Sequence, residues 1–256
     1  MRHNQQIQQQ FGPAAERYVY SPAHAGGEDL VTLASWAEGG LDRIALDVAT
    51  GGGHTALALS PHYREVIATD LTEEMLRAAE AYLAERAGNI RFQRADAESL
   101  PFPPETFDTV SCRIAAHHFQ NVPLFVTEVH RVLKPGGIFL LEDTISPANP
   151  VLDTFLNQLE RMRDSTHVRN LTVVEWLALL DQGGFVVERQ ALFPKVHDVE
   201  AWLERSATPA AKREAVRASL QSTDPLMRVG FEIQLDEGRQ RVEFTAHSIV
   251  IRSRRP

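Results

Sequence analysis

The 256-residue sequence predicts an α/β fold in which parallel strands are joined by crossover helices. The first observation is an alternation, from residue 44 to residue 141, between apolar runs suited to buried strands and segments with helical apolar spacing. The second is that the apolar run Ile44–Val48 leads into the glycine turn Gly51-Gly52-Gly53. In such sheets, a glycine turn after a strand lets a ligand lie against bare backbone.

The segment before the predicted sheet divides into an arm and a helix. Residues 1–27 are rich in Gln and then in aromatic residues, and we expect them to form an N-terminal arm outside the sheet. Apolar residues recur at i, i+3, i+4 and i+7 from Leu30 to Ala37, which predicts a helix that ends at Gly39-Gly40. The expected division is therefore an arm over 1–27 and a main domain over 28–256.

The elements of the sheet follow one another with clear start and stop signals. We expect strands at 44–48, 66–69, 90–94, 107–112 and 138–141, with helices after the first, second and fourth of them. Thr72 and Asn121 can cap two of these helices, and Gly88-Asn89 and the run 134–137 (Lys-Pro-Gly-Gly) can end them.

The alternation between apolar strand runs and segments with helical spacing stops after Glu142-Asp143. Apolar residues between 152 and 159 indicate an extra helix, so a helical cap is expected over about 144–172. Thr172-x-x-Glu175 is a capping box that opens a further helix, and a sixth strand is expected over 185–188. Residues 198–221 are expected to be helical, with Asp198 and Thr208 as caps, and a strand pair (231–235 and 242–251) with a turn at 236–238 should end the chain.

Composition limits the possible partners. The net charge of -8 and the pI near 5.7 argue against a nucleic-acid partner, because phosphate binding needs a clustered basic surface. The single cysteine, Cys112, excludes an internal disulfide framework and fits a reducing compartment. No apolar run has membrane-spanning length and the first residues lack a secretory signal, so we expect a cytoplasmic protein without a membrane span. The oligomeric state stays open.

The glycine turn and a following acid indicate a cofactor that contains adenosine. Asp70 ends the next apolar run, 19 residues after Gly51, where a carboxylate can bind two ribose hydroxyls. The pattern Gly51-x-Gly53-x-x-Ala56 also fits a dinucleotide fingerprint. A carboxylate at Asp47 would oppose a pyrophosphate but would suit the ammonium of S-adenosylmethionine. Charge therefore favours the methyl donor.

Two other readings stay open at this point. An NAD-dependent oxidoreductase would need a hydride-transfer pair such as Tyr-x-x-x-Lys, which we do not find in the sequence. A noncatalytic S-adenosylmethionine-binding protein would keep the glycine turn but would have a blocked methyl exit. Among methylases, the acidic composition disfavours an RNA acceptor, and a protein acceptor stays possible.

Residues 44–143 resemble the class I S-adenosylmethionine-dependent methyltransferases, particularly the ubiquinone/menaquinone C-methyltransferase subgroup of small-molecule methylases. Four motifs carry the resemblance. They are 46–53 (LDVATGGG), 68–71 (ATDL) with Met75 beyond it, 96–98 (DAE) followed by 100–102 (LPF), and 107–108 (FD) through the stop at 134–137. Ala49 departs from the family pattern, which has its first glycine there.

The resemblance implies a Rossmann-like, doubly wound, seven-stranded sheet whose last strand is antiparallel, with the cofactor across the carboxyl ends of the strands. By position, it implies that Asp70 binds the ribose, Asp96 and Ala97 the adenine, and Gly51 and Gly53 the methionine portion. The remaining residues assigned to the cofactor site by the match are Asp47, Ala49, Leu71, Met75 and Arg113. The pattern Phe11-Gly12-x-x-Ala15-x-x-Tyr18 resembles the segment that closes over the cofactor in this subgroup.

The expected reaction is an in-line methyl transfer to a small molecule at oxygen, nitrogen or carbon, promoted by positioning and exclusion of water. His117 and His118 follow the fourth strand, and either could act as a general base, or shape the wall of the site instead. Tyr18 could pack over the sulfonium or simply join the arm to the core. Two adjacent histidines without a third ligand make a poor metal site, so no metal is expected.

Overall fold

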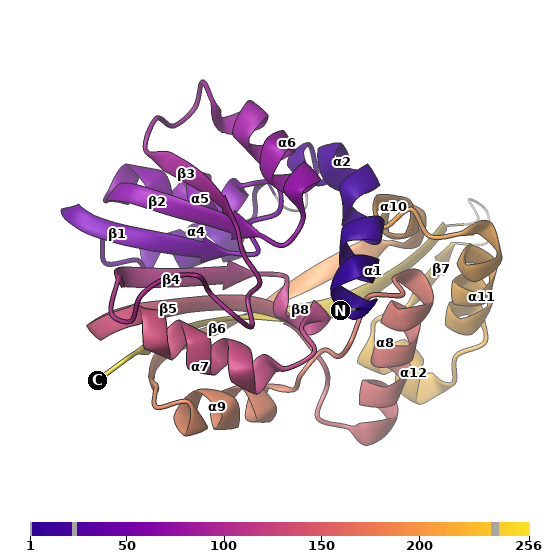
Figure 1. Ribbon diagram of the computed structural model, residues 1–256. Helices are drawn as coiled ribbons and strands as arrows, with labels where there is room; N and C mark the ends of the chain where they lie inside the picture. Colours follow the sequence, from indigo (N-terminus) through magenta and orange to yellow (C-terminus); the bar gives the residue numbers. More distant parts are fainter. Residues whose placement is uncertain (1, 22–24, 237–240) are drawn as a thin grey trace.

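The computed structural model describes residues 2–21, 25–236 and 241–256, and its centre is an eight-stranded sheet (Figure 1). The strands are β1 Gly40–Val48, β2 Tyr63–Asp70, β3 Ile90–Arg94, β4 Phe107–Arg113, β5 Leu133–Ile145, β6 Val186–Asp198, β7 Gln234–Asp236 and β8 Arg241–Arg254. Their order is β3-β2-β1-β4-β5-β8-β6, and β7 pairs with β8. Strands β1 to β5 pair in parallel, whereas β8 is antiparallel to β5 and β6. The predicted α/β sheet with an antiparallel last strand is confirmed; the short β7 makes eight strands where the family resemblance implied seven.

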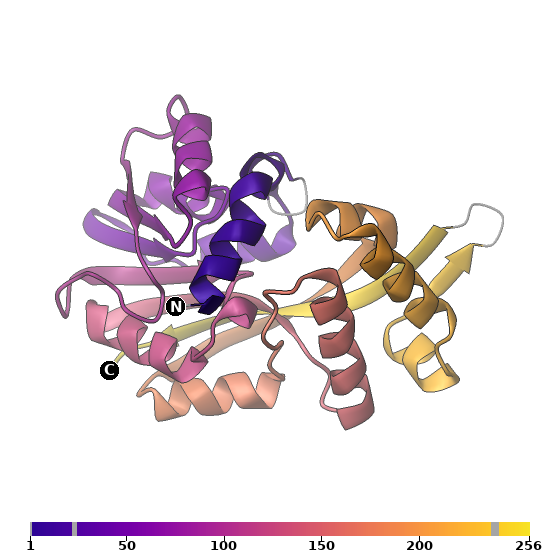
Figure 2. The same cartoon turned by 45° about the vertical axis from the view of Figure 1, so that its right-hand side comes forward.

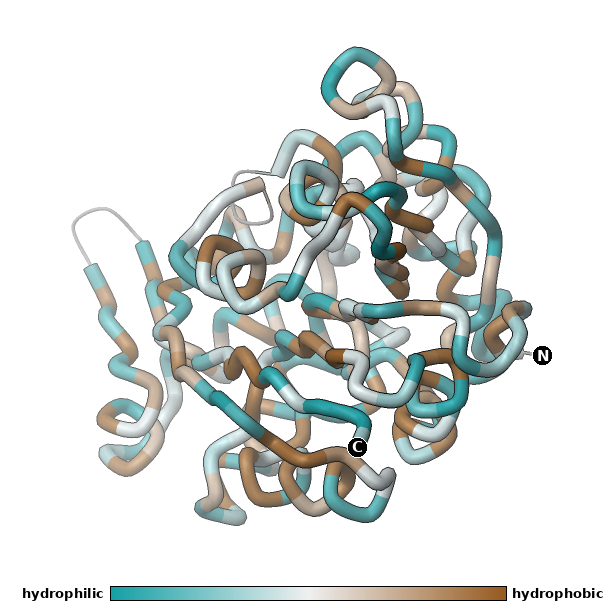
Figure 3. The backbone as a smooth tube through the Cα atoms, turned by 90° about the vertical axis from the view of Figure 1, so that its left-hand side faces the viewer, coloured by the Kyte–Doolittle hydropathy of each residue, from teal (hydrophilic) through white to brown (hydrophobic). Residues whose placement is uncertain are grey.

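Helices cover both faces of the sheet (Figure 1). The helices of the described residues are α1 Arg2–Phe11, α2 Ala15–Val19, α4 Glu28–Ser35, α5 His54–Leu59, α6 Glu73–Leu83, α7 Val122–Val132, α8 Pro150–Arg163, α9 Val173–Gln182, α10 Val199–Arg205, α11 Ala210–Gln221 and α12 Pro225–Gly230. On β5, Ile138 and Leu140 join the apolar cluster beneath α4 and α5, while Phe139 and Leu141 join the cluster beneath α7 and α9. A strand that is buried on both faces reads as a continuous apolar run, and Figure 3 shows such hydrophobic stretches in the central strands.

Side-chain caps fix several helix starts. The Asn121 side chain accepts a hydrogen bond from the Leu124 amide, and Thr172 and Glu175 form the predicted capping box. Asp198 also caps its helix as predicted. Two cap predictions are wrong in detail. Thr72 occupies the N-cap position of α6 but its hydroxyl makes no capping bond, and Pro209, not Thr208, precedes α11.

The largest departure from the predicted elements is β6. A strand over 185–188 was expected, but β6 continues to Asp198 and pairs with β8 from Val186 opposite Arg254 to Asp198 opposite Glu243. Figure 2 shows this two-stranded extension running out of the sheet into a group of helices. Those helices, α8, α10, α11 and α12, share a second apolar cluster with the extended part of β8; its largest members are Trp202, Phe231 and Phe244.

The cap is thus built from two stretches of the chain. Helix α8 lies in the expected 144–172 segment, and α10 to α12 come from residues 199–230. Residues 225–230 form a helix that the sequence pattern did not indicate. Of the expected strand 231–235 only residues 234 and 235 are extended, within β7. The expected turn at 236–238 lies partly outside the described residues. In the part of the chain that is described, no helix has both the length and the apolar character needed to cross a bilayer.

Candidate active site

The glycine turn after β1 has the backbone conformation that its residues predict. Ala49 and Gly51 both have φ of 54°, in the left-handed region, and Gly53 has φ of 81° at the N-cap of α5. A Cβ added at Gly51 would meet nothing within 4 Å, so the backbone there borders open space. A Cβ at Gly53 would lie 2.7 Å from the Leu83 Cδ1 atom. Gly51 therefore leaves room for a ligand, whereas Gly53 lets α5 pack against α6.

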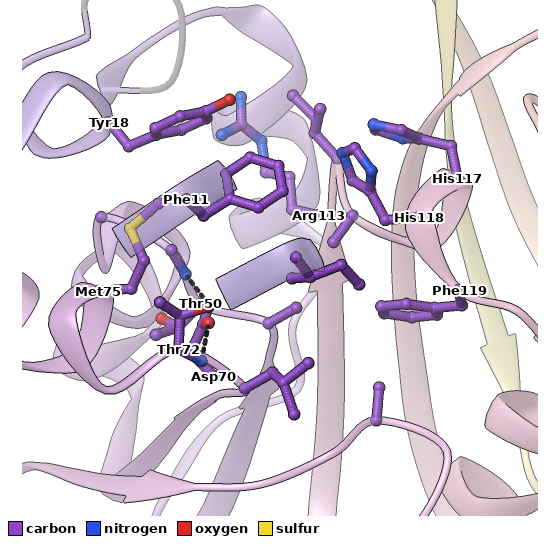
Figure 4. A pocket seen from close by; sticks show the side chains of 18 of the residues that line it. Phe11, Tyr18, Thr50, Asp70, Thr72, Met75, Arg113, His117, His118 and Phe119 are labelled. Atoms are coloured by element: carbon purple, nitrogen blue, oxygen red, sulfur yellow. Dashed lines mark hydrogen bonds between the residues drawn. The ribbon is translucent and has the colours of Figure 1, made fainter. Parts of the chain in front are cut away.

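Asp70 ends β2 beside this turn. Its Oδ2 atom accepts a hydrogen bond from the Gly51 amide at 3.0 Å, and its Oδ1 atom accepts one from the Thr72 amide at 2.9 Å. Both bonds are drawn in Figure 4. Burial raises the pKa of Asp70, and the two amides oppose that change. The carboxylate is thus held in one orientation at the wall of the cavity, with lone pairs left for further donors.

One cavity runs from Asp70 to the segment after β4, which holds His117 and His118 (Figure 4). Figure 4 places Thr72 and Met75 with Asp70 at one end, His117, His118 and Phe119 at the other, and Phe11 between the two ends. Of the residues predicted from the sequence, those lining this cavity are Tyr18, Ala49, Gly51, Asp70, Leu71, Met75, Asp96, Ala97, Arg113, His117 and His118. The fold thus gathers most of the predicted site; Asp47 and Gly53 are the exceptions.

Asp47 lies beneath the turn and does not line the cavity, contrary to the direct ligand contact that the sequence suggested. It is 1% exposed, and its two carboxylate oxygens accept hydrogen bonds from the Thr50 and Ser111 hydroxyls, both at 2.6 Å. Burial raises the pKa of Asp47 to about 6, although both hydroxyls oppose the change. Its physical role in the structure is to tie the turn to β4.

Arg113 lines the cavity but its guanidinium is held by buried acids. Its Nη2 atom donates to Asp29 at 2.6 Å and its Nε atom to Glu142 at 2.5 Å. Lys195 from β6 lies 2.6 Å from Asp29 and 3.5 Å from Glu142. This network therefore joins α4, β4, β5 and β6 behind the cavity.

The N-terminal arm forms one wall of the cavity. In α1, Asn4 donates a hydrogen bond to Asp96 Oδ2 at 2.7 Å, and the His3 ring nitrogen donates to the His118 carbonyl oxygen at 2.8 Å. Phe11 packs edge-on against Tyr18 and His118, with ring centroids 5.5 and 5.1 Å apart. Helix α1 therefore contacts the cavity lining at both Asp96 and His118.

His117 is oriented by an acid that the sequence analysis did not single out. Its Nδ1 atom lies 2.6 Å from Asp143 Oδ1, and Asp143 is 1% exposed at the end of β5. Burial opposes the charged imidazolium, but the Asp143 carboxylate outweighs it and raises the pKa of His117. Since a carboxylate accepts from Nδ1–H, Nε2 is the unprotonated nitrogen of the neutral ring. The acidic pair Glu142-Asp143 after a strand was the available sequence signal.

His118 has a different environment. Its Nδ1 atom lies 3.1 Å from the Thr166 hydroxyl, which itself donates to Asp164 at 2.6 Å, so the His118 nitrogen is the donor. Burial and the neighbouring His117 hold the pKa of His118 well below its usual range. His118 is therefore a neutral wall residue fixed between Thr166 and Phe11.

Known proteins with similar sequences and structures decide the family. Residues 46–141 match the family model described as a methyltransferase domain. The uncharacterized methyltransferase YcgJ of Bacillus subtilis is 39% identical over 242 residues, covering 94% of this chain and 96% of that protein. The chain belongs to the class I S-adenosylmethionine-dependent methyltransferases.

Two further comparisons agree with this assignment. The crystal structure of Bacillus subtilis YcgJ superposes on this methyltransferase with a TM-score of 0.82 at 38% identity, covering 89% of this chain and 97% of that one. The ubiquinone/menaquinone biosynthesis C-methyltransferase UbiE of Syntrophotalea carbinolica is 38% identical over 125 residues, 48% of this chain and 52% of its own. The second match thus covers about half of each of the two chains.

The cavity residues of this methyltransferase fit S-adenosylmethionine. Asp70 presents a carboxylate held by two backbone amides, a group that can accept hydrogen bonds from a pair of ribose hydroxyls, and Gly51 leaves open space at the turn. Leu71, Met75 and Ala97 supply apolar walls beside Asp96. A flat ring between apolar walls with an acid at its edge is the environment that an adenine and its amino group require.

The methyltransferase cap lines the far end of the same cavity with residues that no motif indicated. These are Glu160 and Arg163 of α8, His197 of β6, and Trp202 and Arg205 of α10. They are more than forty positions apart at the extremes, and the β6–β8 extension brings them together. Local sequence spacing could not have shown this grouping.

Proposed function

We propose that this methyltransferase uses S-adenosylmethionine to methylate a small-molecule acceptor that must lose a proton, with His117 as the general base. The observation that carries the proposal is the 2.6 Å contact between His117 Nδ1 and the buried Asp143. His117 lines the cavity and Asp143 does not, so the ring reaches the cavity while its Nδ1 side is held behind it.

The cofactor site proposed here consists of Asp70 for the ribose hydroxyls, Asp96 and Ala97 for the adenine, and residues 49–52 of the glycine turn for the methionine portion. When bound, S-adenosylmethionine supplies a methyl group on a sulfonium whose sulfur leaves as a neutral thioether. Because no anion develops on the leaving sulfur, the protein's own contribution is placement of the acceptor, exclusion of water and removal of the acceptor proton.

His117 can perform the proton removal. The Asp143 carboxylate fixes the tautomer in which Nε2 has the free lone pair, and it stabilises the imidazolium that forms when Nε2 takes a proton. Asp143 is then a positioning residue, because it touches His117 and not the acceptor. Phe11, Tyr18 and Trp202 line the cavity with rings that exclude water.

A small acceptor is favoured over a macromolecule by the way the cavity is enclosed. Helix α1 is bonded to both ends of the cavity through Asp96 and His118, and the cap supplies the wall beyond. A side chain of a folded protein or a base in RNA would have to pass both. The net charge of -8 also disfavours RNA, and a cytoplasmic setting stays our expectation.

Radiolabel transfer tests the class of acceptor. The purified protein is incubated with S-adenosylmethionine labelled on its methyl group and with a cell extract divided by size into metabolites and macromolecules. We expect acid-stable label in the metabolite fraction. The Asp70→Ala variant is the negative control and should transfer no label. Label found only in the protein or RNA fraction would refute the small-molecule acceptor.

The pH dependence of the reaction, measured with the labelled metabolite, tests the base. A base acts when unprotonated, so kcat/KM should rise with pH through the raised pKa of His117 and then level off. We expect His117→Gln to abolish the rise of kcat/KM with pH and to lower kcat by about 10²- to 10⁴-fold. Asp143→Asn should move this rise of kcat/KM to lower pH. Binding of S-adenosylhomocysteine should stay within about twofold in both variants; a larger loss there would make the histidine structural.

A further inference from the structure

Arg205 is a cation without a matching anion at the cap end of the cavity. It is the last residue of α10, it is half-buried, and it lines both the cofactor cavity and a second cavity formed by residues 26–29 and 193–205. Among the described residues, no hydrogen bond or ion pair joins its guanidinium to another side chain or to the backbone. A guanidinium has five N–H donors, and leaving them unpaired away from bulk water costs free energy.

The surroundings of Arg205 are also cationic. Arg163 of α8 lines the same cavity, and burial together with the Arg163 charge lowers the pKa of Arg205. Burial, Arg205, Arg163 and Lys195 lower the pKa of His197 to about 3, which leaves that ring neutral. Tyr18 completes this wall and interacts electrostatically with both arginines.

The acids nearby are already engaged. Glu160 accepts a hydrogen bond from Arg163 Nη1 at 2.8 Å, and Arg163 also lies over the Trp202 ring, 4.7 Å from its centroid. Lys195 is paired with Asp29 and Glu142. Because these acids already neutralise Arg163 and Lys195, the positive charge of Arg205 is not neutralised at this end of the cavity.

We propose that the acceptor carries an oxyanionic group, a carboxylate or a phosphate, which binds Arg205 with Arg163 beside it. This inference rests on the proposed function and adds the chemical class of the acceptor. The planar fork of an arginine matches the paired oxygens of both groups. An anion held at the cap end would place the rest of the acceptor toward His117, because His117, Arg163 and Arg205 line one continuous cavity.

The backbone around Arg205 supports a binding role for this end of α10. Gln10 of α1 donates a hydrogen bond to the Ser206 carbonyl oxygen at 2.7 Å, and Arg17 donates to the Glu204 carbonyl oxygen at 3.2 Å. The arm is thus attached to the residues on either side of Arg205. An acceptor bound there would be enclosed by the same arm that covers the cofactor site.

The test uses the full-length protein with ¹⁵N-labelled arginine, saturated with S-adenosylhomocysteine. Nuclear magnetic resonance follows the arginine Nε–H signals during titration with sodium acetate, sodium phosphate or neutral acetamide at constant ionic strength. The Arg205 signal is assigned by its loss in Arg205→Gln. Arg77→Gln, which alters an exposed arginine of α6, is the matched control.

We expect acetate or phosphate to shift the Arg205 and Arg163 signals saturably, and acetamide to have no such effect. Preference for one anion identifies the group on the acceptor. Arg205→Gln should weaken anion binding at least tenfold as reported by the Arg163 signal, and Arg205→Lys should retain part of it, while Arg77→Gln changes nothing. The proposal is overturned if neither anion gives a saturable shift, if acetamide acts equally, or if Arg205→Gln binds anions as well as the unaltered protein.

The two proposals fail separately in this design. Absence of S-adenosylhomocysteine binding would contradict the cofactor and hence the proposed function, and the anion titration is then performed on the free protein. Normal S-adenosylhomocysteine binding with no anion response at Arg205 would contradict the anionic acceptor alone. Retained cofactor binding in Arg205→Gln also shows that the variant is folded.

Discussion

Replacement of Asp47 by Asn should change how the stability of the protein depends on pH. Asp47 is 1% exposed, and its pKa is raised from 3.8 to about 6, first of all by burial. An acid with a raised pKa in the folded state stabilises that state most when protonated. Its contribution is full below about pH 4, is lost as pH rises toward 6, and is constant above that.

The size of the effect follows from the two pKa values. Each pKa unit corresponds to about 1.4 kcal/mol, so the interval from 3.8 to about 6 corresponds to about 3 kcal/mol. Asn has no charge to bury, and the Thr50 and Ser111 hydroxyls can turn to serve its amide. The free energy of unfolding of Asp47→Asn should therefore rise by about 3 kcal/mol relative to the unaltered protein between pH 4 and pH 7.

Urea unfolding at several pH values measures this difference. Trp176 and Trp202 are buried, so tryptophan fluorescence reports the transition. Asp42→Asn, at an exposed position of the same strand, controls for the loss of one negative charge. If the difference between Asp47→Asn and the unaltered protein is the same at pH 4 and pH 7, the carboxylate is not desolvated and the reasoning is refuted.

Three other substitutions test separate parts of the structure. Asp70→Ala should weaken S-adenosylhomocysteine binding more than tenfold by calorimetry, a loss of about 1.4 kcal/mol, and an unchanged affinity would contradict its ribose role. Gly53→Ala should destabilise the protein by more than Gly51→Ala in urea unfolding. Both alanine variants incur the cost of a left-handed backbone, about 1–2 kcal/mol, but only Gly53→Ala places a Cβ 2.7 Å from Leu83. Equal losses of unfolding free energy in the two variants would contradict that contact. Thr172→Ala should cost about 1 kcal/mol by removing the cap of α9, and a loss below about 0.3 kcal/mol would mean the capping box adds little.

Sequence reasoning succeeded where local patterns determine structure. The expected strand 90–94 has the observed bounds of β3, and the cofactor residues predicted between 49 and 97, except Gly53, line one cavity. Both results depend on short-range signals, since residues 90–94 alternate between partly buried apolar and exposed polar side chains and each motif follows its own strand. Asp47 shows the limit, because spacing located the acid correctly but could not reveal that Thr50 and Ser111 hold it under the turn.

Prediction failed where pairing across the chain decides the structure. Strand β6 carries polar residues such as Arg189, Lys195 and His197, so its sequence lacks the apolar run of a core strand. It is extended because it pairs with β8. The acceptor end of the site depends on that pairing, and for this reason Arg205 had no recognisable sequence signal.

The continuous ladder between β6 and β8 also restricts how this enzyme can open. In proteins with hinged domains, a few loop residues let one body rotate away from another. Here β6 and β8, the two strands that run into the cap, pair without interruption from Arg189 opposite Arg252 to Asp198 opposite Glu243. Rotating the cap outward would have to bend both of these paired strands together, whereas displacing α1 breaks only a few side-chain bonds. Entry of the donor and acceptor and exit of the products should therefore require the N-terminal arm to move away from the cavity. We expect this movement of the arm to limit the rate of turnover.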